Sequence, residues 1–460
     1  MDSKRYFTKR FFIAKVIILL VYLCYTESVS ADAPPRYVFY FIGGGLGAAQ
    51  RQIAEYFYQD LDRKNATKKL FMNSLKYAAL INTASANSRI PDDAASASAL
   101  ATGNKTNNGR ISTLPGGGVY ARTILESASY NGFGTGLITA AKLTEPAAAA
   151  FVSHNNDKTR QDDLAVQIAS SSIDFFAGGG YSHFASRQGE YIVGRSDGQN
   201  LVAKMGGRGY YTFIGADSSN KFRSVQNPKV FAAFTPGHLP FEIDRQKLQY
   251  PENIPSIKEM LEKAIQVLSV RERFLIVING GLIDKALEKH DIVSALNEIV
   301  AFDKAVEVAY NFLKQHPYTT LLIVTGDREV GGLAVNSDSL NFAAVKNCTI
   351  SIVDGIPTLI EDPFTSFDVI INKYLGLDNL NSKDLNDLRK LYDRKDVAGF
   401  NNIVTDIFAN KVGVTFASNG STAEQIPVSI EGQFDYTFQG YMDNIDLPRF
   451  MARAMSINLY

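Results

Sequence analysis

The sequence is poor in the residues that covalent cross-links and soft metal sites require. Its 460 residues include two cysteines, five histidines and no tryptophan. One cysteine, Cys24, lies in an N-terminal segment that we expect to be removed, which leaves Cys348 without a partner for an intrachain disulfide. A metal site built from several thiolates is excluded for the same reason. The stability of the chain must therefore come from a large apolar core.

The chain also lacks a net charge and a cluster of cations. Its 47 Lys and Arg residues balance 47 Asp and Glu residues, and no dense basic block stands out. Proteins that bind nucleic acid neutralise phosphates with clustered cations. The composition therefore excludes nucleic acid as the main partner.

The first 31 residues have the layout of a secretory signal peptide. Five basic residues precede an apolar run from Val16 to Cys24, and small residues follow at 28–31. The run is about half of the ~20 residues that a membrane-spanning helix needs, so we expect no stable membrane anchor. We predict that residues 1–31 are removed on export to a periplasm or to the cell exterior. The remaining chain, 32–460, has 42 basic and 45 acidic residues, a net charge of −3.

Short apolar runs alternate with segments of helical period along the mature chain. The helical period is clearest from Ile292 to Leu313. Runs of strand type, each bounded by Gly or polar residues, lie at 37–42, 134–139, 173–177, 274–278 and 321–325. This order predicts an α/β fold with a mostly parallel central sheet flanked by helices. Ligands bind beyond the carboxyl ends of such strands, so a site is expected in the segments that follow the runs.

Three segments carry motifs. The first apolar run leads into a glycine-rich turn at 41–47, and the last leads into the charged segment 325–333. Between them, residues 90–109 predict a helix that opens at Asp92-Asp93, is filled with small residues and stops at Gly103. Taken alone, the glycine-rich turn is equally consistent with tight packing between a strand and a helix.

Together these motifs resemble those of the alkaline phosphatase family, and the resemblance runs along almost the whole mature chain. Further matches lie at 143–154, 176–180, 278–284 and 413–428. The resemblance implies an alkaline-phosphatase-like three-layer sandwich in a single domain, 32–460. It also implies a metal-dependent phosphomonoesterase: a serine nucleophile, two zinc ions, a magnesium ion and an arginine that clamps the phosphate.

Carried over position by position, the nucleophile and the clamp are missing. The position of the serine is Asp93, and that of the arginine is Lys158, with Arg160 as an alternative. A metal-bridging aspartate of the family is replaced by Gly44. We expect Asp93 to be a helix cap or an ion-pair partner rather than a nucleophile.

The metal positions that the resemblance implies are also changed. One zinc would use the positions of Asp284, Glu288 and Ser421, where the family has an aspartate and two histidines. The other would use those of Asp327 and Arg328, where the family has aspartate and histidine. Among the magnesium positions, which are Glu145, Ala147 and Asn279, only Glu145 still fits.

These changes predict that zinc is not retained. None of the five histidines falls on a metal position, and the guanidinium of Arg328 has no lone pair and repels a cation. We expect no cofactor. The alternative that stays open is a single Mg²⁺ or Ca²⁺ held by the degenerate remnant Asp284, Glu288 and Asp327.

Our hypothesis is that Arg328 takes the place of the lost ion and pairs with Asp93 and Asp327, because unpaired buried carboxylates are costly. Glu329 is expected to be solvated or salt-bridged. Residues from about 334 to 412 match the family least, so we predict a variable insertion there and a place to look for a distinct binding function.

The leading interpretation is an exported, catalytically inactive pseudophosphatase with a binding, scaffolding or heteromeric role. Because the family commonly forms dimers, a homodimer or a dimer with an active relative is expected. The alternative is a phosphate monoester hydrolase with a rebuilt, non-zinc or single-ion active site.

Overall fold

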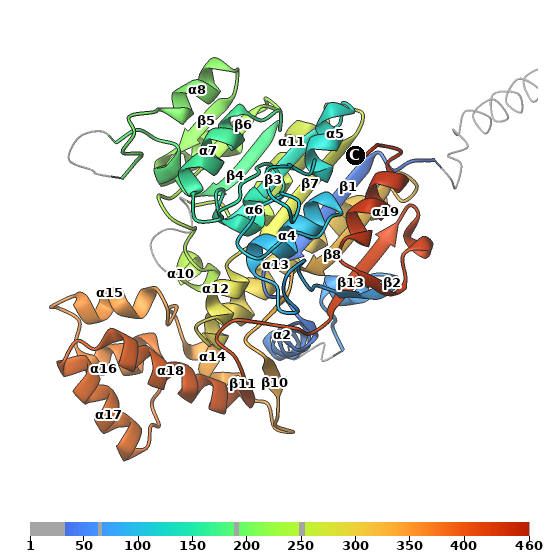
Figure 1. Ribbon diagram of the computed structural model, residues 1–460. Coiled ribbons are helices and arrows are strands. Elements are labelled where there is room, and N and C mark those ends of the chain that lie inside the picture. Colours follow the sequence, from blue (N-terminus) through green and yellow to red (C-terminus); the bar gives the residue numbers. More distant parts are fainter. Residues whose placement is uncertain (1–32, 63–66, 188–192, 248–253, 460) are drawn as a thin grey trace, which may run out of the picture.

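The computed structural model of the chain describes residues 33–62, 67–187, 193–247 and 254–459 (Figure 1). The predicted signal peptide, 1–31, lies outside these ranges. Within them, no helix combines the length and the apolar character that crossing a membrane requires.

A ten-stranded sheet forms the centre of the molecule. Its spatial order is β14-β2-β13-β8-β1-β7-β3-β4-β6-β5. The strands are β1 (Tyr37–Gly43), β2 (Tyr77–Asn82), β3 (Gly134–Lys142), β4 (Phe175–Gly179), β5 (Tyr211–Ile214), β6 (Val230–Ala233), β7 (Phe274–Gly280), β8 (Thr320–Gly326), β13 (Ile426–Gly432) and β14 (Gly440–Asp443). Only β13 runs antiparallel to its neighbours in this sheet, so the prediction of a mostly parallel sheet is confirmed.

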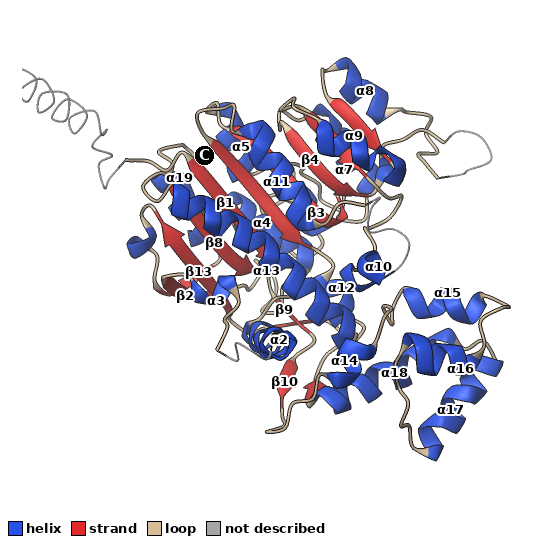
Figure 2. Cartoon of the chain, turned by 180° about the vertical axis from the view of Figure 1, so that it is seen from behind, coloured by secondary structure: helices blue, strands red, loops and turns tan. Residues whose placement is uncertain are grey.

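Helices cover both faces of the sheet, which gives the three layers expected from the resemblance (Figure 2). Phe39 and Phe41 of β1 point into one core, and Val38, Tyr40 and Ile42 point into the other, as the alternation of a strand buried on both faces demands. The first core includes α2 (Ala48–Leu61), α11 (Ile257–Leu268), α12 (Ile283–Leu287) and α13 (Ile292–Gln315). The second includes α4 (Asp93–Thr102), α5 (Ile124–Tyr130), α7 (Gln161–Ser170) and α19 (Asp446–Ala454).

A group of helices projects from the sheet between two short paired strands, β10 (Leu333–Val335) and β11 (Val414–Phe416) (Figure 1). It contains α14 (Ala343–Asn347), α15 (Gly355–Glu361), α16 (Phe367–Val369), α17 (Ser382–Asp393) and α18 (Val397–Val412). The expected insertion, 334–412, therefore corresponds to a helical segment whose two ends meet in a two-stranded neck. Its variability within the family stays a prediction.

The remaining α-helices and strands are short. They are α3 (Phe71–Ser74), α6 (Pro146–Ala149), α8 (Leu201–Gly207), α9 (Ser219–Ser224), α10 (Glu242–Lys247), β9 (Glu329–Val330) and β12 (Ser421–Thr422).

The helix α4 forms as its sequence predicts. Asp92 is the N-cap, and its carboxylate accepts a hydrogen bond of 2.8 Å from the backbone N–H of Ala95. Gly103 ends the helix in the left-handed region, at φ 69°. Because the residues between are small and buried, α4 lies close to the elements around it, and Asp93 stands at its first turn.

The three central strands end at one level, and this level positions the site. Gly43 at the end of β1 is in register with Gly280 of β7 and Gly326 of β8. Gly326 cannot carry a side chain, because a Cβ there would lie 2.4 Å from the carbonyl oxygen of Leu46. The glycine-rich turn, α12 and the segment after β8 therefore converge at the carboxyl edge of the sheet.

Glu298 of α13 makes the stability of this fold sensitive to pH. Its buried carboxyl accepts a hydrogen bond of 2.5 Å from the backbone N–H of Glu242, and burial raises its pKa to about 8. Above the ordinary pKa of a glutamate, the folded chain keeps a proton that the unfolded chain releases. The free energy of unfolding should therefore fall as the pH rises from about 4.5 to about 8, by at most ~1.4 kcal/mol per pH unit from this group.

We expect Glu298→Gln, which keeps the accepting oxygen, to flatten this pH dependence. Urea unfolding at several pH values between 5 and 8 measures the free energy of unfolding of each protein. The pH-dependent part that the variant loses should be about 1 kcal/mol or more, which a single strongly shifted carboxyl can contribute. The control is Glu361→Gln, an exposed residue in the last turn of α15. Identical pH profiles for wild type and Glu298→Gln would show that Glu298 does not titrate in this way.

Candidate active site

A buried guanidinium lies at the carboxyl edge of the sheet. Arg328 follows β8 and is 2% exposed. Its side chain lies between α12, which precedes it in the sequence, and the strand β12 with Ser421, which follows it. Its Nη1 lies 2.6 Å from Oδ2 of Asp327, and its Nη2 lies 3.0 Å from Oδ2 of Asp284 and 3.6 Å from Oε1 of Glu288. Its Nε donates a hydrogen bond of 2.9 Å to Oγ of Ser421. Arg328 thus contacts three acidic side chains and one hydroxyl.

Burial and charge act in opposite directions on this group. Burial raises the pKa of Asp327 to about 6, although the neighbouring Arg328 favours the ionised form. Burial also raises the pKa of Asp284. For Arg328 burial disfavours the charge, but Asp327 and Asp284 outweigh it and raise its pKa above the ordinary value. The guanidinium is therefore permanently charged and holds the acids around it.

The second oxygen of Asp327 ties this pair to the glycine-rich turn. Oδ1 of Asp327 accepts hydrogen bonds from the backbone N–H groups of Gly45, at 2.9 Å, and Arg328, at 2.7 Å. Both oxygens of this fully buried carboxylate are satisfied. The turn at 43–47 and the segment after β8 are joined here.

Gly44 faces the other acid. A Cβ at position 44 would lie 3.0 Å from Cγ of Asp284, so an aspartate there would bring a second carboxylate against the first. Oδ1 of Asp284 is buried and has no hydrogen-bond partner among the described residues. The missing side chain at position 44 therefore removes a negative charge from a place where like charges would repel.

Asp93 does not pair with Arg328, contrary to our hypothesis. Its Oδ1 lies 2.5 Å from Nζ of Lys158, which is also 3.0 Å from Oδ2 of Asp92. The backbone N–H of Lys158 donates a hydrogen bond to the carbonyl of Gly109, which holds Lys158 against the loop after α4. Burial opposes the ionisation of Asp93, but the charges of Arg328 and Lys158 outweigh it and hold its pKa below the ordinary value.

Two expectations about neighbouring residues are resolved by these contacts. Asp92 is the helix cap and also pairs with Lys158, whereas Asp93 is an ion-pair partner of Lys158 and not the cap. Of the two cations considered for the clamp position, Lys158 lies beside Asp93, whereas Arg160 is exposed and pairs with Asp163.

A second group of organic cations surrounds Glu145. Nζ of Lys285 lies 2.7 Å from Oε1 of Glu145, and Nζ of Lys142 lies 3.5 Å from Oε2. Burial disfavours the charge of Lys285, but Glu145 raises its pKa above the ordinary value. Asn279 engages Thr139, whose Oγ1 lies 3.0 Å from Oδ1. Lys285 follows Asp284 directly in the sequence, but only the fold shows that the two adjacent side chains have different partners. Lys285 pairs with Glu145, and Asp284 pairs with Arg328.

Glu329 is neither solvated nor salt-bridged, which corrects our expectation. It is buried and accepts hydrogen bonds from the side chains of Gln50 and Thr422 and from the backbone N–H groups of Gly332 and Leu333. It joins α2, β9 and β12, so its role is structural. Gln50 lies on α2, far away in the sequence, and the motif gave no signal for it.

All five histidines lie in described parts of the chain and have other partners. They are His154 with Glu126, His183 with Asp162, His238 with Asp354, His290 with the carbonyl of Ser418, and His316 against the rings of Tyr37 and Phe312. Within residues 33–459, the parts that the structure describes contain no cluster of three or more His, Cys, Asp or Glu side chains arranged for a metal ion.

The residues present do not fit the zinc ions of the family. A zinc site needs imidazole, thiolate or carboxylate donors around an open centre. Here the space among Asp284, Glu288 and Ser421 is entered by the guanidinium of Arg328, which offers donors of hydrogen bonds and no electron pair.

Comparison with known proteins identifies the family of the chain. The family model described as alkaline phosphatase matches residues 36–457. Alkaline phosphatase 3 of Bacillus subtilis (strain 168) is 26% identical over 435 residues, which cover 92% of this chain and 89% of that protein. Alkaline phosphatase of Schizosaccharomyces pombe is 25% identical, with 94% and 84% covered.

The likeness extends to the fold. The crystal structure of the cold-active alkaline phosphatase from Shewanella sp. matches with a TM-score of 0.79 at 26% identity, and the match covers 91% of this chain and 99% of that one. Fold, motifs and family model agree over the same residues. The chain therefore belongs to the alkaline phosphatase family.

Proposed function

We propose that this protein is an exported pseudophosphatase in which organic cations stand at the metal positions of its family. The observation that carries the proposal is the environment of Arg328. Its guanidinium contacts Asp284, Glu288 and Ser421, the three positions at which the resemblance places the ligands of one zinc ion. The charge of the ion is replaced, but its Lewis acidity and its open coordination position are not.

The other parts of the family's chemistry support the same proposal. A serine nucleophile is replaced by Asp93, whose carboxylate is engaged by Lys158. Glu145, the one magnesium position that still fits, is engaged by Lys285 and Lys142. Each acid at the family's site positions thus has a side-chain cation within reach, and no step of metal-dependent phosphoryl transfer follows from these residues.

The charge of the edge also opposes phosphate binding. The formal sum is −2 over Asp93, Asp284, Glu288, Asp327, Lys158 and Arg328. A phosphate monoester dianion would be repelled by such a site, because its binding depends on surplus positive charge. A binding, scaffolding or heteromeric role, as a homodimer or with an active relative, is consistent with a retained fold that has lost its reaction.

The proposal makes a prediction about metal content and turnover. We expect the purified mature chain to hold zinc and magnesium only substoichiometrically and to hydrolyse no p-nitrophenyl phosphate above background, with or without added Zn²⁺, Mg²⁺ or Ca²⁺, because the ligand positions are engaged by Arg328 and Lys285. Elemental analysis and a colorimetric assay measure the two quantities. An active family member purified in the same way is the positive control.

The competing proposal is a hydrolase with a single-ion site at Asp284, Glu288 and Asp327. It predicts a stoichiometric, tightly bound ion and a turnover that Asp327→Asn abolishes. That combined result would overturn the pseudophosphatase proposal.

The proposal also makes a prediction about stability. We expect Arg328→Met to lower the free energy of unfolding by about 3–5 kcal/mol, because it leaves buried carboxylates without a cation. Replacing one acid as well, in Arg328→Met/Asp284→Asn, should recover part of the loss. Urea unfolding measures both variants. Arg394→Met, a change at an exposed arginine at the end of α17, should shift stability by no more than about 0.5 kcal/mol.

A loss at Arg328 no larger than that at Arg394 would mean that the guanidinium does not compensate the acids. The same conclusion would follow if Arg328→Met/Asp284→Asn had a lower free energy of unfolding than Arg328→Met alone.

A further inference from the structure

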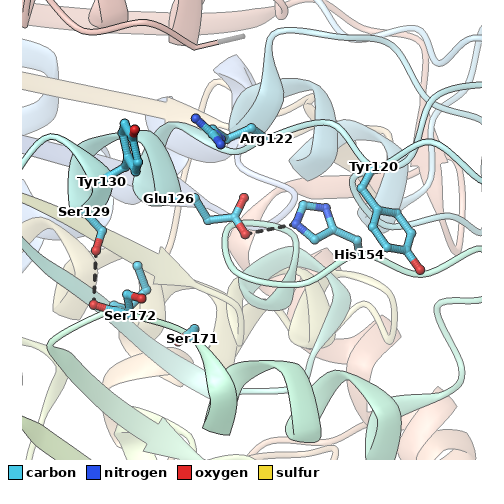
Figure 3. Close-up of a pocket in the computed structure, with 9 residues that line it drawn as sticks. Tyr120, Arg122, Glu126, Ser129, Tyr130, His154, Ser171 and Ser172 are labelled. Atoms are coloured by element: carbon cyan, nitrogen blue, oxygen red, sulfur yellow. Dashed lines mark hydrogen bonds and ion pairs between the residues drawn. The ribbon is translucent and has the colours of Figure 1, made fainter.

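A cavity of about 510 Å³ lies beside α5, apart from the residues of the candidate active site (Figure 3). Its walls come from the segment that leads into α5, from α5 itself, from the loop that carries His154, and from residues 171–173 ahead of β4. A volume of this size is within the range of small-molecule sites. None of Asp93, Asp284, Asp327 or Arg328 lines it.

The inner wall is polar and fixed. Nε2 of His154 lies 3.0 Å from Oε1 of Glu126, and its Nδ1 lies 3.0 Å from the carbonyl oxygen of Ser112. A carboxylate and a carbonyl oxygen only accept, so the two contacts favour the protonated ring. Burial disfavours the charge of His154, but Glu126 raises its pKa above the ordinary value. The other oxygen of Glu126 accepts from the backbone N–H of Thr123 in the cap of α5. The charges of His154 and Glu126 cancel each other, and neither side chain is free to swing away.

Two tyrosine rings stand at the rim. Tyr120 is 61% exposed and stacks on the ring of His154, with centroids 5.1 Å apart and an interplanar angle of 21°. Tyr130, in the last turn of α5, is 80% exposed. Figure 3 shows the two rings on opposite sides of the Glu126–His154 pair. Both rings therefore offer an aromatic face to a ligand in the cavity.

Arg122 is an exposed cation at the edge of the cavity. Its guanidinium carbon lies 5.2 Å from the centroid of Tyr130. Among the described residues, no carboxylate lies within ion-pair distance of this guanidinium, and Glu126 is already engaged by His154. The lining therefore carries a net charge of +1, from Arg122, next to aromatic surface.

We propose that this cavity is a binding site for an acidic saccharide, a sugar that bears a carboxylate. The flat C–H face of a sugar ring covers a tyrosine ring, its hydroxyls meet the serines at 171 and 172, and its carboxylate pairs with Arg122. A neutral sugar would form no ion pair with Arg122, and a purely apolar ring would form no hydrogen bond with the hydroxyls of the lining. The inference does not depend on whether the chain hydrolyses phosphate, because the two sets of residues differ.

The test is titration calorimetry on the full mature chain at low salt, with digalacturonate as the probe and maltose as its neutral counterpart. We expect digalacturonate to bind at least about tenfold more tightly than maltose. Arg122→Gln should remove that preference, and Tyr130→Ala should weaken the binding of digalacturonate, while Tyr130→Phe, which keeps the ring, should not. Tyr318→Ala, at a tyrosine 66% exposed elsewhere on the surface, should change nothing.

Thermal unfolding of each variant separates loss of binding from loss of fold. Three results would overturn the proposal: no binding of digalacturonate to the folded wild type, equal affinities for digalacturonate and maltose, or a wild-type affinity in folded Arg122→Gln. Benzoate that binds as tightly as digalacturonate would also overturn it, because the site would then recognise any carboxylate beside an aromatic surface.

Discussion

The structure at the carboxyl edge of the sheet depends on one buried charge, the guanidinium of Arg328. It reaches acids on two segments, Asp327 after β8 and Asp284 on α12, and Asp327 in turn holds the turn after β1 through Gly45. Three converging segments therefore share one cation. Without it, carboxylates that burial already makes difficult to ionise would face one another across a dry space.

In a metalloenzyme the ions at such an edge do two things: they compensate buried acids and they activate the reacting groups. An arginine or a lysine can do only the first. Under our proposal, Arg328 and Lys285 keep the packing of a metal-binding edge while its chemistry is lost. This separation explains how the fold of the alkaline phosphatase family can persist around residues that fit no zinc ion.

Much of the fold was predictable because local signals agreed with the tertiary outcome. The apolar run at 37–42 had to be a strand buried on both faces, and Asp92 and Gly103 mark the ends of α4 by capping chemistry that acts within a few residues. The site was predictable in its residue types and less so in its pairs. Asp93 and Arg328 both belong to it, but whether they touch depends on where the loop with Lys158 lies.

The sequence by itself determined the α/β class, since this follows from local pattern and composition. Its resemblance to the family implied which residues occupy the site positions and that none of them is a histidine. Tertiary structure alone decided which cation pairs with which acid. Arg328 pairs with Asp284 and Asp327, and Lys158 pairs with Asp93. It also decided that Tyr120, Arg122 and Tyr130 border one cavity. The physical reason is that ion pairing and cavity shape depend on distances of a few ångströms between residues far apart in the chain, and no local propensity encodes those distances.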